Sequence, residues 1–456
     1  MTAGSPAGTP AYDDDPRGLA RWREARSDPP SHAVWEITRR CDLGCLHCGS
    51  RAGRAQVGEL STREALGLAG ELAAVGIREV SLIGGEVYMR EDWHQIAAEI
   101  VRLGMVCSVV TGARQITQDR LTLAVQAGVS KISISIDGLE QTHDSLRGSR
   151  GSWRAAVAAA RNIGASGIDL SVNTQINRLS MPELPGVAEL LAEIGARSWM
   201  VILTAAMGRA ADRGGLLLQP YHLLHLFPML AAIKREQLEP AGIALFPANN
   251  VGYFGPIAET LRYGADRGHA WPGCDAGVSC LGIEADGRIK GCPSLPTRDY
   301  TIGTVRKQSL AAMWQDRADG GAVAKAEDLW GFCATCPHAA RCRAGCTWTS
   351  HVLLGRRGNN PYCHFRALSF AERGRAETLE PCLAAPGTPF DFGHWQIVER
   401  DLCEVQKDDP LIERTLAAQL FGVKPDAGSL WSAQERGDIL SVSKVNTTQP
   451  GQQAQH

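Results

Sequence analysis

Cys41, Cys45 and Cys48 place three thiols within eight residues, in the run Cys41-Asp-Leu-Gly-Cys45-Leu-His-Cys48. A cubane iron–sulfur cluster is normally held by four cysteine thiolates. Three cysteines leave one iron without a protein ligand, and an open coordination position is typical of a catalytic metal. A zinc site is the alternative, although zinc usually takes four ligands in two spaced pairs. The spacing therefore predicts a reactive iron–sulfur site.

Polar groups at the ends of other β-rich runs could bind a small ligand beside this cluster. In Gly84-Gly85-Glu86, two glycines let the backbone approach a ligand closely, and the carboxylate can accept a hydrogen bond from an ammonium group. Thr111, Ser135 and Asn173 end three further β-rich runs, and we expect them to face the same site. No residue is assigned as a general acid or base, so the catalytic residue is left unknown.

A second group of eight cysteines follows in the C-terminal half, and eight is the number that two complete four-cysteine clusters require. Two zinc sites are the alternative, because paired cysteines also suit zinc. His338 lies within this run and is expected to be exposed, since the cysteines suffice as ligands. Three other cysteines, Cys107, Cys382 and Cys403, receive no role. The eight are Cys274, Cys280, Cys292, Cys333, Cys336, Cys342, Cys346 and Cys363.

The elements that must position these residues alternate between short β-rich runs and amphipathic helices from about residue 33 to residue 207. Six strands alternating with helices predict a parallel sheet with right-handed crossovers. The apolar content of the strands indicates burial on both faces. The predicted strands are Val34–Thr38, Glu79–Ile83, Val106–Thr111, Lys131–Ile136, Asp169–Gln175 and Trp199–Leu203.

The cysteine triad and the Gly-Gly-Glu triplet together resemble the radical S-adenosylmethionine (radical SAM) superfamily. In that family the amino and carboxylate groups of SAM bind the open iron, and SAM is cleaved to a 5′-deoxyadenosyl radical that removes a substrate hydrogen atom. The resemblance implies SAM as cofactor and an α/β fold with an open (β/α)6 partial TIM barrel. It also implies SAM contacts from Gly84, Gly85, Glu86 and Ser135. Val87 stands where the family's Gly-Gly-Glu-Pro motif has proline.

The later cysteines resemble the SPASM domain, a cysteine-rich extension of many radical SAM maturases, through the run Cys-x2-Cys-x5-Cys-x3-Cys that starts at Cys333. The resemblance implies two auxiliary 4Fe-4S clusters, and so three clusters in all. Their ligands would interleave along the chain, and Cys292 would end a small hairpin. The first would be held by Cys274, Cys280, Cys292 and Cys346, and the second by Cys333, Cys336, Cys342 and Cys363.

The resemblance implies an enzyme that oxidatively modifies a ribosomally made peptide or protein, by a cross-link or a related change. A tetrapyrrole-modifying enzyme of the heme pathway is the alternative, because the Val34–Cys41 run resembles that group too. A sulfatase-maturing, formylglycine-forming enzyme is a weaker alternative, since Pro293 stands where that family has an aspartate base. The implied partners are the substrate, reduced flavodoxin or ferredoxin as electron donor, and a separate leader-peptide-binding protein, because only about 30 residues precede the first strand.

Length and charge set the remaining expectations. The 456 residues carry a net charge of −2, which gives no electrostatic case for nucleic acid or an anionic membrane. The chain shows neither an apolar run of the ~18 residues that span a membrane nor a signal region, so cytoplasm is expected. The predicted divisions are a flexible N-terminus (1–30), a radical SAM core (31–207), a connecting segment (208–272), a SPASM domain (273–365), a helical extension (366–440) and a disordered tail (441–456).

Overall fold

The computed structural model describes residues 30–248, 251, 254–262, 274, 276–316, 322–424 and 430–443. The N-terminus and tail that we expected to be disordered therefore lie almost wholly outside the described residues. Parts of the connecting segment, at 249–250, 252–253 and 263–272, also lie outside them.

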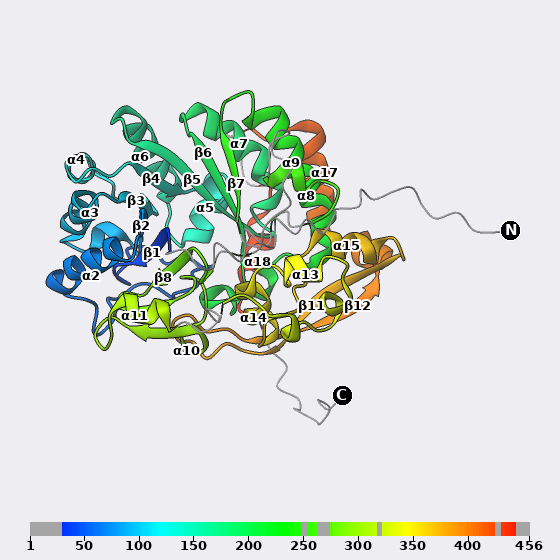
Figure 1. Cartoon of the computed structure of the whole chain (residues 1–456). Helices are drawn as coiled ribbons and strands as arrows, with labels where there is room; N and C mark the ends of the chain where they lie inside the picture. Colours follow the sequence, from blue (N-terminus) through cyan, green and yellow to red (C-terminus); the bar gives the residue numbers. More distant parts are fainter. Residues whose placement is uncertain are drawn as a thin grey trace.

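A ten-stranded sheet forms the centre of the fold, in the order β10-β9-β8-β1-β2-β3-β4-β5-β6-β7 (Figure 1). The six predicted strands are β1–β6, and they are parallel to one another. The prediction missed that β7 and β8 extend this sheet in parallel at its two sides and that β9 and β10 continue it antiparallel. The strands are β1 (His32–Glu36), β2 (Glu79–Ile83), β3 (Val106–Thr111), β4 (Lys131–Ser135), β5 (Asp169–Ile176), β6 (Ser198–Leu203), β7 (Ala244–Pro247), β8 (Cys280–Ile283), β9 (Arg288–Lys290) and β10 (Thr301–Thr304).

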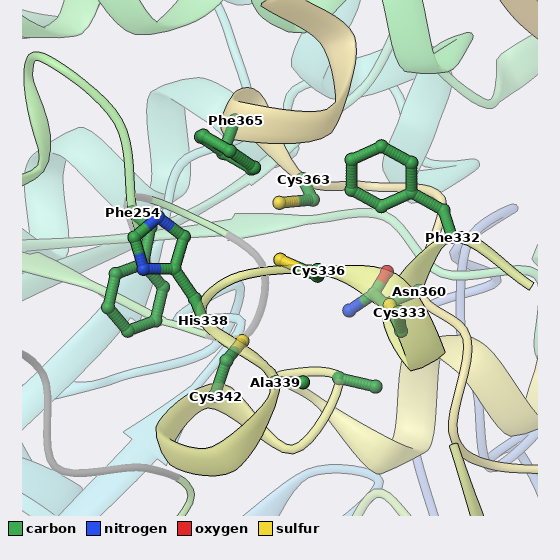
Figure 2. Close-up of a pocket in the computed structure, with 11 residues that line it drawn as sticks. Phe254, Phe332, Cys333, Cys336, His338, Ala339, Cys342, Asn360, Cys363 and Phe365 are labelled. Atoms are coloured by element: carbon green, nitrogen blue, oxygen red, sulfur yellow. The ribbon is translucent and has the colours of Figure 1, made fainter. Parts of the chain in front are cut away.

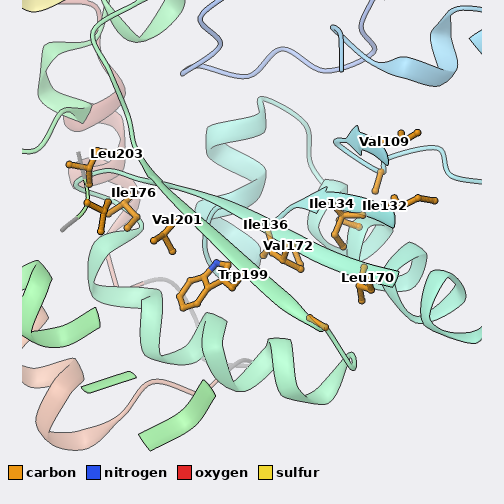
Figure 3. Packing of buried hydrophobic residues seen from close by; sticks show 14 of the residues in the cluster. Val109, Ile132, Ile134, Ile136, Leu170, Val172, Ile176, Trp199, Val201 and Leu203 are labelled. Atoms are coloured by element: carbon orange, nitrogen blue, oxygen red, sulfur yellow. The ribbon is translucent and has the colours of Figure 1, made fainter. Parts of the chain in front are cut away.

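Helices cover the outer face of the sheet (Figure 1). The first begins at a capping box, in which the Ser61 hydroxyl accepts from the backbone of Glu64 and the Glu64 carboxylate accepts from Ser61. Apolar residues of helices and strands pack into one continuous core, part of which Figure 3 shows around Trp199 and Ile134. The helices of this layer are α2 (Thr62–Ala74), α3 (Trp93–Arg102), α4 (Gln118–Gln126), α5 (Glu140–Arg147), α6 (Ser152–Ala165), α7 (Leu184–Glu193), α8 (Leu223–Ile233) and α9 (Ala258–Arg262).

The inner face of the strands carries many polar side chains, and residues such as Ser108 and Ser171 are buried there, in agreement with the expected burial on both faces. Alternate residues of one strand point to opposite faces. On β5, Leu170 and Val172 belong to the core, whereas Ser171 lies on the inner face beside Ser198 of β6, and their hydroxyl oxygens are 2.8 Å apart. Ser81 and Ser108 make the same contact between β2 and β3. The barrel interior therefore presents hydroxyl and carboxamide groups.

The C-terminal third forms a second layer against the open side of the barrel (Figure 1). The segment predicted to be a helical extension also contains a β-hairpin of β11 (Arg375–Leu383) and β12 (His394–Asp401), which corrects that prediction. The first part of β11 is packed inward, with Ala376, Glu377 and Leu379 buried, whereas its last three residues are exposed. The helices here are α10 (Thr297–Tyr300), α11 (Leu310–Gln315), α12 (Phe332–Thr335), α13 (Ala339–Cys342), α14 (Thr347–Leu354), α15 (His364–Ala371), α16 (Leu402–Lys407), α17 (Pro410–Phe421) and α18 (Ala433–Leu440).

One continuous stretch of short and regular helices, Gly214–Leu238, is long and apolar enough by composition to cross a membrane. Within its most apolar window, 72% of the residues are buried inside the fold. A buried stretch of this kind is typical of a core helix in a globular protein, and Leu226, Phe227 and Leu230 are parts of the main core.

Candidate functional site

The loop after β1 carries Cys41, Cys45 and Cys48. The backbone N–H of Leu43 donates to Cys41 Sγ and that of Ala52 donates to Cys48 Sγ, both at 3.4 Å. Burial, together with the charges of Cys45 and Cys48, raises the pKa of Cys41 to about 12. Thiols that repel one another as anions need a cation between them to be held as thiolates. The loop is therefore suited to hold a positively charged metal group.

Arg147, at the end of α5, links this loop to the end of β4. Its Nη1 lies 3.6 Å from Cys45 Sγ, and its Nη2 lies 2.6 Å from Asp137 Oδ2. His47 pairs with the same carboxylate, with Nε2 2.9 Å from Asp137 Oδ2. The Arg147 guanidinium and the His47 ring hold the pKa of the buried Asp137 well below its usual range, against the opposing effect of burial. The sequence analysis missed this network, because its members are 10, 90 and 100 residues apart in the chain.

Glu86 follows β2, and its carboxylate is fixed by hydrogen bonds from residues at the end of β3. Its Oε1 accepts from Thr111 Oγ1 at 2.6 Å, and its Oε2 accepts from the Gly112 N–H at 2.8 Å. Burial raises the pKa of Glu86 to about 7. Thr111 thus positions this carboxylate, and its own contact with a ligand stays a prediction.

The glycines of the Gly84-Gly85-Glu86 triplet are required by the chain itself. A Cβ on Gly84 would lie 2.6 Å from the Thr38 carbonyl oxygen, and one on Gly85 would lie 2.5 Å from that of Arg40. The Gly85 N–H donates to the Thr38 carbonyl at 2.7 Å. These glycines therefore have a structural role in addition to the expected approach to a ligand. They let the end of β2 pack against the segment that leads into Cys41.

Ser135 and Asn173 are direct neighbours across β4 and β5. Asn173 Oδ1 is buried and has no hydrogen-bond partner among the described residues. A buried carboxamide oxygen without a partner is unfavourable unless a ligand or water donates to it. The pair is therefore suited to bind a polar ligand at the carboxyl ends of the strands, where barrel enzymes place their active sites.

Four of the later cysteines, Cys333, Cys336, Cys342 and Cys363, line one cavity (Figure 2). Burial, together with the charges of Cys333 and Cys336, raises the pKa of Cys363 to about 12. Within the described part of the chain, no three His, Cys, Asp or Glu side chains converge on a position for a single metal ion. The four thiols instead surround a space.

Aromatic side chains wall this cavity. Phe254 stacks on His338 with ring centroids 4.4 Å apart, and Phe365 meets His338 edge-on at 4.8 Å. His338 is therefore half-buried beside the thiols, and the expectation that it is exposed was wrong. Phe332 also lines the cavity (Figure 2).

The other four cysteines of the C-terminal half lie around the β8–β9 hairpin. Cys280 begins β8, and Cys292 follows β9, which is antiparallel to β8. The charge of Cys292 helps to raise the pKa of Cys346 to about 11, so these two thiols are close. Cys274 and Cys292 both pack against the apolar cluster of Ala276, Leu295 and Ala322. The remaining cysteines stand apart: Cys107 is a buried core residue, whereas Cys382 and Cys403 are exposed.

Comparison with known proteins agrees with this arrangement. Residues 35–191 match the radical SAM superfamily, and residues 274–337 match the SPASM iron–sulfur cluster-binding domain. The AdoMet-dependent heme synthase of Methanosarcina barkeri is 26% identical over 362 residues, which cover 75% of this chain and 98% of that protein. The mycofactocin maturase MftC of Mycobacterium tuberculosis is 26% identical over 327 residues, which cover 70% of this chain and 78% of that protein.

A solved structure, that of Streptococcus suis SuiB bound to S-adenosylmethionine, superposes with a TM-score of 0.58 at 15% identity. The superposition covers 76% of this chain and 79% of that one. At this identity the likeness concerns the fold alone.

Proposed function

This chain belongs to the radical SAM superfamily and carries a SPASM domain, and from that premise we propose that it oxidatively modifies a ribosomally made peptide or protein. The family makes the chain a radical SAM oxidoreductase. The substrate class is the further step. The PqqA peptide cyclase of Rhizobium meliloti, which is 24% identical to this chain over 74% of this chain's length, supports a peptide substrate.

The donor sets of this chain fit three iron–sulfur clusters. Cys41, Cys45 and Cys48 would hold the cluster that leaves one iron open for SAM. When bound, SAM and this cluster supply a 5′-deoxyadenosyl radical that removes a substrate hydrogen atom. The unpartnered Asn173 Oδ1 and the neighbouring Ser135 hydroxyl would bind polar groups of SAM, and Glu86 would face its amino group from a fixed position.

The cavity of Cys333, Cys336, Cys342 and Cys363 is the observation that carries the oxidative part of the proposal. Four sulfurs around one zinc ion would converge to about 3.8 Å apart, given a Zn–S bond of about 2.3 Å. Among the described residues no three His, Cys, Asp or Glu side chains converge on a position for a single metal ion, so the four thiols suit a four-iron cluster better than zinc. A cluster with four protein ligands has no open iron, so it would carry electrons instead of binding substrate. Cys274, Cys280, Cys292 and Cys346 would hold the other auxiliary cluster.

A tetrapyrrole substrate is the second candidate, because the likeness to the heme synthase extends over 98% of that protein. The sulfatase-maturing alternative has less support, since Pro293 follows Cys292 and offers only a carbonyl oxygen, which accepts from Lys290 at 3.0 Å. Reduced flavodoxin or ferredoxin would supply the electron for SAM cleavage. A separate leader-binding protein and a cytoplasmic location complete the proposal.

Anaerobic co-expression with each short reading frame beside the gene, followed by intact mass of the peptide, tests the substrate class. A product lighter by two hydrogens that is missing with the Cys41→Ala/Cys45→Ala/Cys48→Ala variant would support a peptide substrate. An unchanged peptide that shows no deuterium uptake, together with a porphyrin that co-purifies with the enzyme, would favour the tetrapyrrole.

Iron analysis tests the auxiliary clusters separately. Cys342→Ala is expected to lose up to about four irons per chain, the content of one cubane cluster. Cys107→Ala, which changes a buried cysteine outside both groups, is expected to keep the parent iron content. Equal iron in both variants would remove the assignment of Cys342.

A further inference from the structure

Glu36 is a buried carboxylate that the proposed function leaves without a role. It ends β1 and is 4% exposed, and its neighbours Trp35 and Ile37 face the opposite side, in the main core. Glu36 therefore points to the inner, polar face of the sheet. Its Oε2 is buried and has no hydrogen-bond partner among the described residues. Burial is the main reason that the pKa of Glu36 rises to about 7.

A second carboxylate and a buried ammonium lie beside Glu36. The register of β1 with β8 places Trp35 beside Ile283, and so Glu36 beside Glu284. Lys290 is fully buried, and its Nζ lies 2.7 Å from Glu284 Oε1. The charges of Arg39 and Lys290 lower the pKa of Glu36, and that of Glu284 raises it. Protonation of Glu36 therefore depends on the charge in its surroundings.

Glu36 is linked through its neighbours to two of the cysteine groups. On one side its carboxylate accepts from the Ser50 hydroxyl, whose oxygen is 3.6 Å from Cys48 Sγ. On the other side it faces Lys290, whose charge also acts on Cys292. A negative charge that arrives near Cys292 would thus be sensed at Glu36. Glu36 points to the inner face, and its Oε2 has no hydrogen-bond partner among the described residues. Together with its neighbours, these features suit a group that accepts a proton next to an electron acceptor.

We propose that Glu36 accepts the proton that the substrate releases when it is oxidised by the auxiliary cluster of Cys274, Cys280, Cys292 and Cys346. The inference rests on the proposed function and names the group that takes up the proton released in the substrate oxidation. The substrate loses one hydrogen atom to the 5′-deoxyadenosyl radical, then one electron to the oxidised auxiliary cluster and one proton to the Glu36 carboxylate. The product has then lost two hydrogens and gained one new bond or bond order.

A pH-dependent midpoint potential of this cluster is the consequence, and it can be measured without a substrate. Above about pH 7 Glu36 is ionised beside the oxidised cluster. Reduction adds negative charge and so favours uptake of a proton at Glu36. The midpoint potential therefore falls as pH rises, by up to about 59 mV for each tenfold decrease in proton concentration in a one-electron step.

EPR-monitored redox titration of the full-length, cluster-loaded Cys41→Ala/Cys45→Ala/Cys48→Ala chain isolates the auxiliary signals. Glu36→Gln is expected to abolish the slope, and Glu36→Asp to retain one. Glu183→Gln is the matched control, because Glu183 is also fully buried and burial raises its pKa to about 7. Its carboxylate accepts hydrogen bonds from the Leu139 N–H and the Thr142 hydroxyl. These partners follow β4, which lies four strands from β8 in the sheet. It should keep the parent slope.

The outcomes separate this inference from the proposed function. A parent whose auxiliary midpoints do not change with pH, or a slope that persists in Glu36→Gln, overturns the role of Glu36. Either result leaves the proposed function in place if the parent cleaves SAM and binds iron at its auxiliary cysteines. Auxiliary cysteines that bind no iron would instead overturn the proposed function.

Discussion

Substitution of Gly85 by alanine tests the idea that the glycine pair serves the cysteine loop through close backbone contact. The added Cβ would lie 2.5 Å from the Arg40 carbonyl oxygen and 2.6 Å from that of Arg39. Ordinary van der Waals contact begins at about 3.4 Å, so the two segments must separate by about 0.9 Å. Both partners are backbone atoms and cannot rotate away. Gly85 does not have a positive φ, so steric overlap is the only new strain.

The expected effect is larger on chemistry than on stability. Overpacking of this kind typically costs about 1–3 kcal/mol. The displaced carbonyls directly precede Cys41, and a shift of about 1 Å at a reacting group can lower the rate on the order of 10²-fold. We therefore expect Gly85→Ala to fold, to bind nearly the parent amount of iron, and to produce 5′-deoxyadenosine from SAM on the order of 10²-fold more slowly per bound cluster.

Gly67→Ala is the matched control, because Gly67 lies on the exposed side of α2 and a Cβ there meets nothing within 4 Å. This change should stabilise the chain by about 0.5–1 kcal/mol and leave SAM cleavage unchanged. Anaerobic urea unfolding and chromatographic quantification of 5′-deoxyadenosine measure the two effects. Parent-like SAM cleavage by Gly85→Ala would refute the reasoning.

Two further substitutions test buried charge networks by urea unfolding. Arg147→Gln leaves the Asp137 carboxylate buried with only His47 as its ion-pair partner and should cost about 3–5 kcal/mol. The double variant with Asp137→Asn should cost less, and a larger loss in the double variant would contradict the pairing. Asp409→Asn weakens hydrogen bonds from Tyr221, His222 and Arg178 and should cost about 2–4 kcal/mol, whereas the exposed neighbour Asp408→Asn should change little. The hydrogen-bond partners lower the pKa of Asp409, so its contribution to the free energy of unfolding is present above its unfolded pKa of about 3.9 and is lost as pH falls below that value. The free energies of unfolding of Asp409→Asn and Asp408→Asn should therefore converge in acid.

The barrel strands could be predicted because each is a short β-rich run in which apolar residues recur at every second position, bounded by turn residues. The predicted bounds of β2 and β3 agree with the structure, and β5 is one residue longer than predicted. The strands that extend the sheet could not be predicted in the same way. β8 joins β1 across about 240 residues of chain, and no local pattern states which distant strand completes an edge.

The β11–β12 hairpin shows the same limit in the C-terminal segment. The loop between these strands reaches back to the cysteine loop, where Arg51 Nε donates to Asp391 Oδ1 at 2.8 Å and Arg51 Nη1 to Asp212 Oδ2 at 2.7 Å. Phe390 of the same loop lies under the Lys290 ammonium, 4.3 Å from the ring centroid. The loop thus joins the triad segment to the hairpin that ends at Cys292. Ion pairs between residues 340 positions apart leave no trace in a single sequence.

The cysteines could be found from the sequence because thiols in close spacing have few other uses, whereas the groups around them are ordinary residues. Glu36 at the end of a strand, Lys290 in a hairpin and Arg147 at the end of a helix gain a chemical role only from their neighbours. Each lies one contact away from a predicted cysteine group, through Ser50, through the charge on Cys292 and through Cys45. If the cluster chemistry is common to the family, the proton that accompanies each electron must still go to a particular group. In this chain the polar inner face leaves Glu36, with its buried and unpartnered oxygen, as the group placed to receive it.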